Sequence, residues 1–244
     1  MPRTLDRWWR ANRGWFAWKL RHPTGRYHDY YVQRVEESLD AGDVHVSLGA
    51  RSVQDERHDA AGKLILAHLI REGLRPDHTL VDYGCGSLRI GRHLVGYLQP
   101  DRYLGADVTE RFYREGLANL DAELRETKRP RFQAIDAVWP REASAPPPDF
   151  VISIGVLIHV PRGELGEYLD RVAALTGPTT RAYVSFFDAE RHERLSEMTW
   201  TWPAERLLAA ARARGLAAAV QDLPDWPLAQ DRRKRLLVLR RAAS

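Results

Sequence analysis

The segment 80–91, with the sequence LVDYGCGSLRIG, constrains the fold of this chain more than any other. The apolar run that ends at Val81 predicts a buried strand, and apolar residues then recur at helical spacing. Between them, Gly84 allows the chain to reverse, and Gly86 allows backbone to come close to a ligand. The segment therefore predicts a strand, a tight turn and a helix whose first N–H groups can meet a ligand.

Three residues, one before this turn and two after it, indicate the kind of ligand. A dinucleotide-binding turn has Gly or Ala three positions after its second glycine, where this chain has Arg89. Asp82 ends the strand, and a carboxylate there repels a pyrophosphate but suits a cationic group such as a sulfonium. A second predicted strand ends in Asp107, 21 residues after Gly86, a distance at which an acid accepts hydrogen bonds from ribose hydroxyls.

The run DYGCG, residues 82–86, resembles motif I of the class I S-adenosylmethionine-dependent methyltransferases. The resemblance covers about residues 52–240. It implies an α/β, Rossmann-like fold, with a seven-stranded, mostly parallel sheet, helices on both faces and an antiparallel last strand. It also implies S-adenosyl-L-methionine as cofactor and S-adenosyl-L-homocysteine as product. We expect a methyltransferase domain over residues 51–244 and an N-terminal helical extension over residues 1–50.

The same resemblance implies cofactor contacts at Asp82, Gly84, Cys85, Gly86, Arg89, Asp107, Asp136, Ala137, Ile154 and Gly155. In this assignment Asp82 lies near the ammonium group, Asp107 accepts from the ribose hydroxyls and Asp136 accepts from the adenine amino group. The turn approaches the methionine part through its backbone, and the two residues at the end of the fourth strand flank the sulfur. Arg89 is larger than the residues common in this turn and would bind the cofactor carboxylate or an acidic acceptor.

Methyl transfer does not require a catalytic triad, because the cofactor carries the reactivity and the protein supplies position and electrostatics. A hydroxyl acceptor would still need a group that takes its proton. His159, after the fourth predicted strand, is the first candidate because imidazole titrates near neutrality, and Asp188, after the fifth, is the second. Packing is the alternative role for His159, and we expect no metal.

Aromatic residues outside motif I are candidates for the acceptor site. In the family, helices before motif I often fold over the cofactor, so Tyr27, Tyr30 and Tyr31 would line a substrate pocket, with ordinary core packing as the alternative. The segment 188–202 ends in aromatic residues that include Trp200 and follows the fifth strand, at the edge where open α/β sheets bind ligands. A lid over the site and a plain surface loop are both compatible with it.

The segment 3–20 combines an apolar stripe of Trp, Phe and Leu with arginines on other faces. Such a helix is typical of membrane interfaces, and packing on its own domain or exchange within a homodimer are the alternatives. The chain has no 18-residue apolar run for a membrane span and no apolar core of a signal peptide. With a single cysteine, this predicts a cytoplasmic protein, with contact at the inner face of the membrane left open.

The acceptor class follows from a fuller resemblance to bacterial methyltransferases of natural-product or surface-polysaccharide pathways. This resemblance rests on the run GCGSLR, His58, Trp226-Pro227 and Gln230. It favours O-methylation of a small-molecule, natural-product or glycan acceptor, which includes lipid-linked ones.

Other classes fit the sequence less well. Methylation of base amino groups uses an Asn/Asp-Pro-Pro-Tyr/Phe run after the fourth strand, and the segment 153–156 lacks it. The net charge of +4 arises mainly from the first 26 residues, so nucleic acid is not an expected partner. A protein methyltransferase and a non-catalytic cofactor-binding protein stay open, whereas Asp82 and Arg89 disfavour an NAD-linked oxidoreductase.

Overall fold

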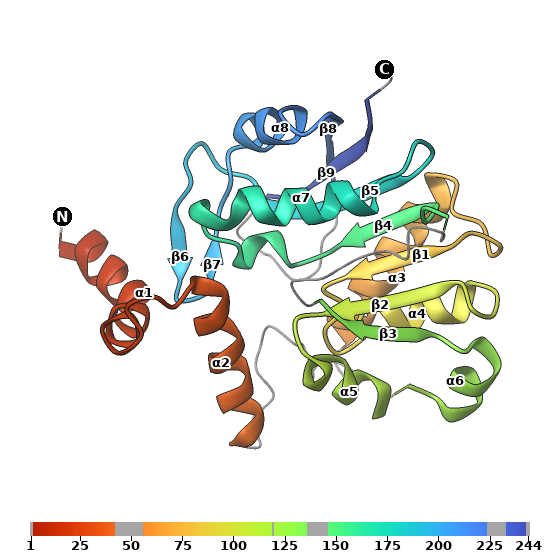
Figure 1. Cartoon of the computed structure of the whole chain (residues 1–244), viewed down its shortest axis with the longest axis horizontal. Coiled ribbons are helices and arrows are strands. Elements are labelled where there is room, and N and C mark those ends of the chain that lie inside the picture. The colour runs from red at the N-terminus through yellow and green to blue at the C-terminus, as the bar shows by residue number, and fades with distance from the viewer. Residues whose placement is uncertain (1, 42–55, 119, 136–145, 224–232, 243–244) are drawn as a thin grey trace.

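One sheet of seven strands lies at the centre of the computed structural model, which describes residues 2–41, 56–118, 120–135, 146–223 and 233–242. Its strands are β1 (Leu80–Tyr83), β2 (Tyr103–Asp107), β3 (Arg131–Ala134), β4 (Phe150–Ser153), β5 (Arg181–Phe187), β8 (Leu216–Asp222) and β9 (Lys234–Arg241). They lie in the order β3–β2–β1–β4–β5–β9–β8 (Figure 1). The last strand, β9, is antiparallel to both of its neighbours, and the β1, β2, β3, β4 and β5 pairs are parallel. The predicted sheet and its antiparallel last strand are confirmed.

The strand order places a crevice where the predicted turn is. From β1 the chain moves outward to β2 and β3, and then returns to the other side of β1 as β4. Leu80 is thus in register with Tyr103 of β2 and with Phe150 of β4. Both β1 and β4 are buried along their whole length, as their apolar sequences require of central parallel strands. Ligands of such sheets bind beyond the carboxyl ends of the strands at this point of reversal.

Helices cover both faces of the sheet, as predicted. One face packs against α3 (Glu56–Arg71), α4 (Gly91–Tyr97), α5 (Glu110–Ala118) and α6 (Ala122–Lys128). The other packs against α7 (Leu165–Leu175) and α8 (Ala204–Arg212). Two short 3-10 helices, η2 (Leu157–His159) and η3 (Arg162–Glu164), connect β4 to α7. The two apolar cores fix the strand ends that surround the crevice.

The N-terminal helices α1 (Pro2–Arg21) and α2 (Tyr27–Asp40) lie beyond the carboxyl ends of the strands, beside the hairpin of β6 (Arg194–Ser196) and β7 (Thr199–Trp200) (Figure 1). We call these three parts the cap. A small core of its own holds the cap together: Trp18, Tyr27, Tyr30, Met198 and Trp200. The segment 188–202 is therefore no plain surface loop, because its hairpin packs against both helices. No helix in the described part of the chain is long and apolar enough to cross a membrane.

Candidate functional site

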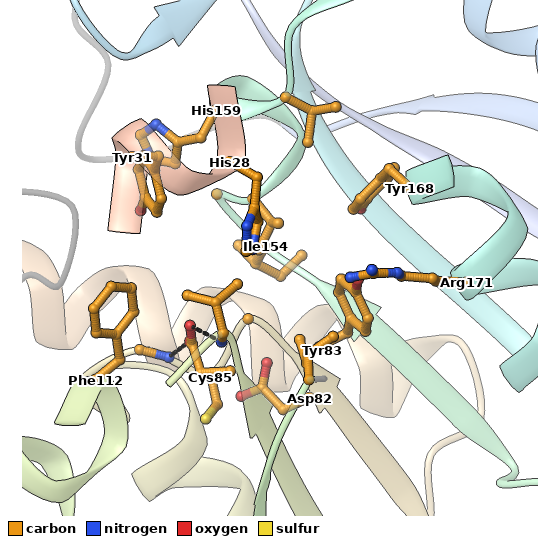
Figure 2. A pocket seen from close by; sticks show the side chains of 18 of the residues that line it. His28, Tyr31, Asp82, Tyr83, Cys85, Phe112, Ile154, His159, Tyr168 and Arg171 are labelled. Carbon is orange, nitrogen blue, oxygen red and sulfur yellow. Dashed lines mark hydrogen bonds between the residues drawn. The ribbon is translucent and has the colours of Figure 1, made fainter. Parts of the chain in front are cut away.

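The turn after β1 lines a cavity at the carboxyl ends of β1 and β4 (Figure 2). Gly84 and Gly86 have φ angles of +84° and +51°, which glycine adopts without strain. The N–H groups of Gly84 and Cys85 both donate to the carbonyl of Ala106, at 2.7 and 3.0 Å. A Cβ on Gly84 would lie 2.1 Å from Cγ2 of Val156, so a larger residue at this position has no space. Backbone therefore forms this wall of the cavity, as the sequence predicted.

Asp107, at the end of β2, is held by two backbone donors. Its Oδ2 accepts from the N–H of Gly86 at 2.7 Å and its Oδ1 from the N–H of Val108 at 2.8 Å. Burial raises the pKa of this carboxyl to about 6, against the effect of the two N–H groups. Each carboxylate oxygen has a second lone pair, so both can still accept from a ligand. The arrangement suits a pair of ribose hydroxyls.

Asp82 and Arg89 lie on the methionine side of the turn in the predicted assignment. Oδ2 of Asp82 accepts from the hydroxyl of Tyr103 at 2.8 Å, and burial raises the pKa of this carboxyl to about 7. Burial lowers the pKa of Arg89, although the charge of Asp82 opposes this. The Nε of Arg89 is buried and has no hydrogen-bond partner among the described residues. Because a buried donor without a partner is costly, the site fits a ligand that brings an acceptor such as a carboxylate.

The cap closes the opposite side of the cavity. His28 and Tyr31 reach down from α2, and Figure 2 shows His28 over Ile154, with Tyr31 and His159 to one side and Arg171 to the other. The rings of Tyr31 and His159 are 5.1 Å apart. Charged side chains complete this wall. Arg26, just before α2, pairs with Glu164 of η3 and with Glu167 of α7, and Arg171 of α7 also pairs with Glu167.

The side chain of His159 has a defined tautomer. Its Nδ1 contacts the carbonyl oxygen of Met198 in the hairpin of the cap. A carbonyl oxygen can only accept, so Nδ1 carries the proton and Nε2 is the accepting nitrogen of the neutral ring. The cap thus fixes which ring nitrogen of His159 can accept a hydrogen bond.

Most of the predicted site residues that the structure describes line this one cavity. They are Asp82, Gly84, Cys85, Gly86, Arg89, Asp107, Ile154, Gly155, Tyr27, Tyr31 and His159. Asp136 and Ala137, predicted near the adenine ring, lie outside the described residues.

Three predicted residues do not line the cavity. Asp188, which directly follows β5, accepts a hydrogen bond from Arg235 of β9 at 3.0 Å, so its carboxylate is paired. Tyr30 donates to the carboxylate of Glu197 in the cap's core. Trp200 packs there too, with its ring 4.6 Å from that of Tyr27. The structure thus places the second candidate base and two of the four expected substrate contacts outside this cavity.

Several lining residues were missed by the sequence analysis. Those on the nucleoside side are Val108, Phe112 and Ile135, and those on the cap side are Arg26, His28, Glu164, Glu167, Tyr168 and Arg171. His28 has a buried Nε2 with no hydrogen-bond partner in the described part of the chain. Helical spacing is the signal that could have found it, because His28 lies three residues before Tyr31 and shares its face of α2.

The strand order, the glycine turn and the acidic strand ends are those of a nucleoside-binding, Rossmann-like domain. Residues 53–223 match the family model described as "Methyltransferase domain". This match covers more than half of the chain, and the chain belongs to this family. The predicted class, an S-adenosylmethionine-dependent methyltransferase, is thereby confirmed.

Solved structures agree with the fold. The 1,6-didemethyltoxoflavin-N1-methyltransferase of Burkholderia thailandensis, solved with 1,6-didemethyltoxoflavin and S-adenosylhomocysteine, is 18% identical with a TM-score of 0.62, over 91% of this chain and 92% of that one. The magnesium protoporphyrin IX methyltransferase of Synechocystis PCC 6803, with S-adenosylhomocysteine, is 18% identical with a TM-score of 0.59, over 98% and 100%. The [4+2]-cyclase SpnF, 16% identical, has a TM-score of 0.57 over 74% and 82%. Likeness at this level establishes the fold alone, as the cyclase illustrates.

Proposed function

We propose that the chain moves a methyl group from S-adenosylmethionine to a hydroxyl group of a small acceptor molecule. One observation carries the proposal: a single cavity is lined both by the glycine turn with Asp107 and by His159 and Tyr31 under the cap. A cofactor at the turn and an acceptor under the cap would thus share one enclosed space. The small ligands in the names of the similar methyltransferases support an acceptor of this size, and a natural product or the end of a glycan also fits.

The residues that would hold the cofactor follow from the donors and acceptors of the cavity. Asp107 would accept from the ribose hydroxyls, and Phe112 and Ile135 offer apolar surface to the adenine ring. Arg89 would donate its buried Nε–H to the cofactor carboxylate. When bound, S-adenosylmethionine supplies a methyl group activated by a positive sulfur. Contacts of Asp136 and Ala137 with the adenine stay predictions of the resemblance.

His159 is the proposed general base. Its Nε2 would take the proton of the acceptor hydroxyl, while Nδ1 keeps its proton on the carbonyl of Met198. The resulting imidazolium would be stabilised by that carbonyl, whose partial negative charge faces Nδ1. Tyr31, beside the imidazole, would orient the acceptor through its ring.

The cofactor site is tested by isothermal titration of the full chain with S-adenosylhomocysteine, NAD or buffer. We expect micromolar binding of S-adenosylhomocysteine and no binding of NAD. The substitution Asp107→Asn should weaken binding about tenfold or more, because one acceptor becomes a donor that faces an N–H group. The exposed Asp77, which pairs with neighbouring Arg75, provides the matched control Asp77→Asn. Binding of NAD instead, or equal affinity of the two variants, would contradict the proposal.

The base is tested by turnover, measured as release of S-adenosylhomocysteine with a panel of hydroxylated small molecules. General-base catalysis contributes about 10²- to 10⁴-fold, so His159→Ala should lower kcat by at least about 100-fold and leave the affinity for S-adenosylhomocysteine unchanged. His192 is the matched control, because its Nδ1 also contacts a backbone carbonyl, that of Thr201, at 2.7 Å, and it does not line the cavity. A loss of less than about threefold in His159→Ala would make His159 a structural residue.

A further inference from the structure

We propose that α1 docks on the surface of an anionic membrane. The inner face of this helix is fixed in the cap. Ala11 and Trp18 are buried, and Trp15 packs against Trp18 with ring centroids 5.4 Å apart. Oδ1 of Asn12, also buried, accepts from Arg194 of the hairpin at 2.8 Å. These contacts determine which face of α1 points outward.

The outward face is apolar. Trp9, Phe16 and Leu20 are 54%, 37% and 85% exposed, and their spacing of seven and four residues places them on one stripe of the helix. Trp8 is 52% exposed and packs beside this stripe, with its ring centroid 5.6 Å from that of Phe16. In the described part of the chain, the other large apolar side chain with comparable exposure is Ile70 of α3, far from this group in sequence. The concentration of exposed aromatic surface on one helix needs a partner.

The charge of α1 indicates what this partner is. Residues 8–21 contain four cationic side chains, Arg10, Arg13, Lys19 and Arg21, and no acidic residue. Arg13 lies within the apolar stripe, and Arg10 and Arg21 are exposed beside it. Aromatic rings beside arginines fit the boundary between acyl chains and anionic headgroups, which attract basic side chains electrostatically. A second copy of this face would instead bring the same arginines against one another.

The position of α1 suits such docking. The helix projects from the body of the molecule at the N-terminal end of the cap, away from the sheet (Figure 1). Its outward stripe can therefore meet a flat surface while the inner face stays packed on the hairpin. After the turn at residues 22–26 the chain enters α2, which carries Tyr27, His28 and Tyr31 into the cavity. The docking face and the cap side of the cavity are thus built on consecutive helices.

Co-sedimentation of the full chain with vesicles tests the proposal. Vesicles of phosphatidylcholine alone should retain little protein, and vesicles with added phosphatidylglycerol should bind it at low salt and release it at high salt. The double variant Trp9→Ser and Phe16→Ser should lose about tenfold in partition, because two aromatic side chains no longer leave water. The variant Arg13→Glu should lose at least about fivefold. Thermal unfolding checks that these exposed substitutions leave the fold intact.

The matched controls remove the same chemistry elsewhere. Ile70→Ser removes an exposed apolar side chain of α3, and Arg212→Glu reverses an exposed charge of α8. Both should bind vesicles like the unchanged chain. Quenching of tryptophan fluorescence by brominated phosphatidylglycerol should disappear in Trp8→Phe with Trp9→Phe. Equal binding of all variants, no binding to any vesicle, or a dimer in sedimentation velocity that the Trp9 and Phe16 variant dissolves would overturn the proposal.

Discussion

Gly84 is the residue whose identity the site depends on most directly. The positive φ of this position and the 2.1 Å approach of Val156 to a Cβ built on it are independent obstacles to any other residue. Val156 itself follows β4, so the close contact joins the two strand ends that form the crevice. Gly84 therefore sets the separation of these strand ends as well as the shape of the turn.

The substitution Gly84→Ala should destabilise the protein by about 2–5 kcal/mol, because the strain of a positive φ adds to overpacking against Val156. Gly96 of α4 is the matched control, since it is exposed and a Cβ there meets nothing within 4 Å. Gly96→Ala should stabilise the protein by up to about 1 kcal/mol through helix propensity. Urea unfolding measures both, and a Gly84→Ala variant as stable as Gly96→Ala would contradict this account of the turn.

Among single residues, the sequence predicted the positions of the glycine turn and of the strand ends better than the partners that side chains meet there. Asp82 and Asp107 could be predicted because parallel strands deliver the residues at their carboxyl ends to the crevice. Asp188 directly follows β5, but Arg235 of β9, 47 residues later, donates a hydrogen bond to its carboxylate. Such pairing depends on which strand is inserted next to β5, and no local pattern records that.

At the scale of elements, the cap matters most to the site, because it forms one wall of the cavity at the strand ends. Neighbouring tyrosines of α2 show how it is built: Tyr30 turns into its core and Tyr31 into the cavity. A stripe of aromatic residues predicted both helices, but their partner, the hairpin of β6 and β7, lies some 170 residues away in sequence. The sequence therefore could not decide between a lid and a loop, because the decision is made by contacts between distant segments.

Trp200→Ala should loosen the cap without unfolding the sheet. Trp200 is buried between Tyr27 and the guanidinium of Arg194, which lies 4.9 Å from its ring, and removal of a buried Trp costs about 3–5 kcal/mol. Hydrogen exchange should accelerate in α2 and stay slow in β1 and β4. Arg191→Ala, an exposed change in the same segment, should alter neither. Equal acceleration in the sheet would show that the cap is not a separate unit of stability.

At the scale of the whole molecule, two buried carboxyls lower stability near neutral pH. The pKa of Asp82 is about 7 and that of Asp107 about 6, both above the ordinary value near 3.8. The folded state therefore holds these protons more tightly than the unfolded state, and the free energy of unfolding falls as the pH rises from about 4 to about 7. Burial lowers the pKa of His68, His93 and His192, which has the opposite effect in this range.

The contribution of Asp82 can be isolated as a difference between variants. Asp82→Asn removes the titration, so its stability relative to the unchanged chain should be greater at pH 8 than at pH 5, by at least about 1 kcal/mol. The histidines cancel in this difference. Asp77→Asn should show no such change, because the lowered pKa of Asp77 lies below both pH values. Urea unfolding at the two pH values measures it, and a constant difference for Asp82→Asn would refute the effect.

Cys85, in the middle of the glycine turn, determines how this turn reacts with oxidants. It is the sole sulfhydryl of the chain and is buried, and burial raises the pKa of its thiol well above the ordinary value. Peroxide and disulfide exchange attack the thiolate form, which is scarce at such a position near neutral pH. The turn that shapes the cavity should therefore react slowly with common oxidants, although Cys85 lines the cavity.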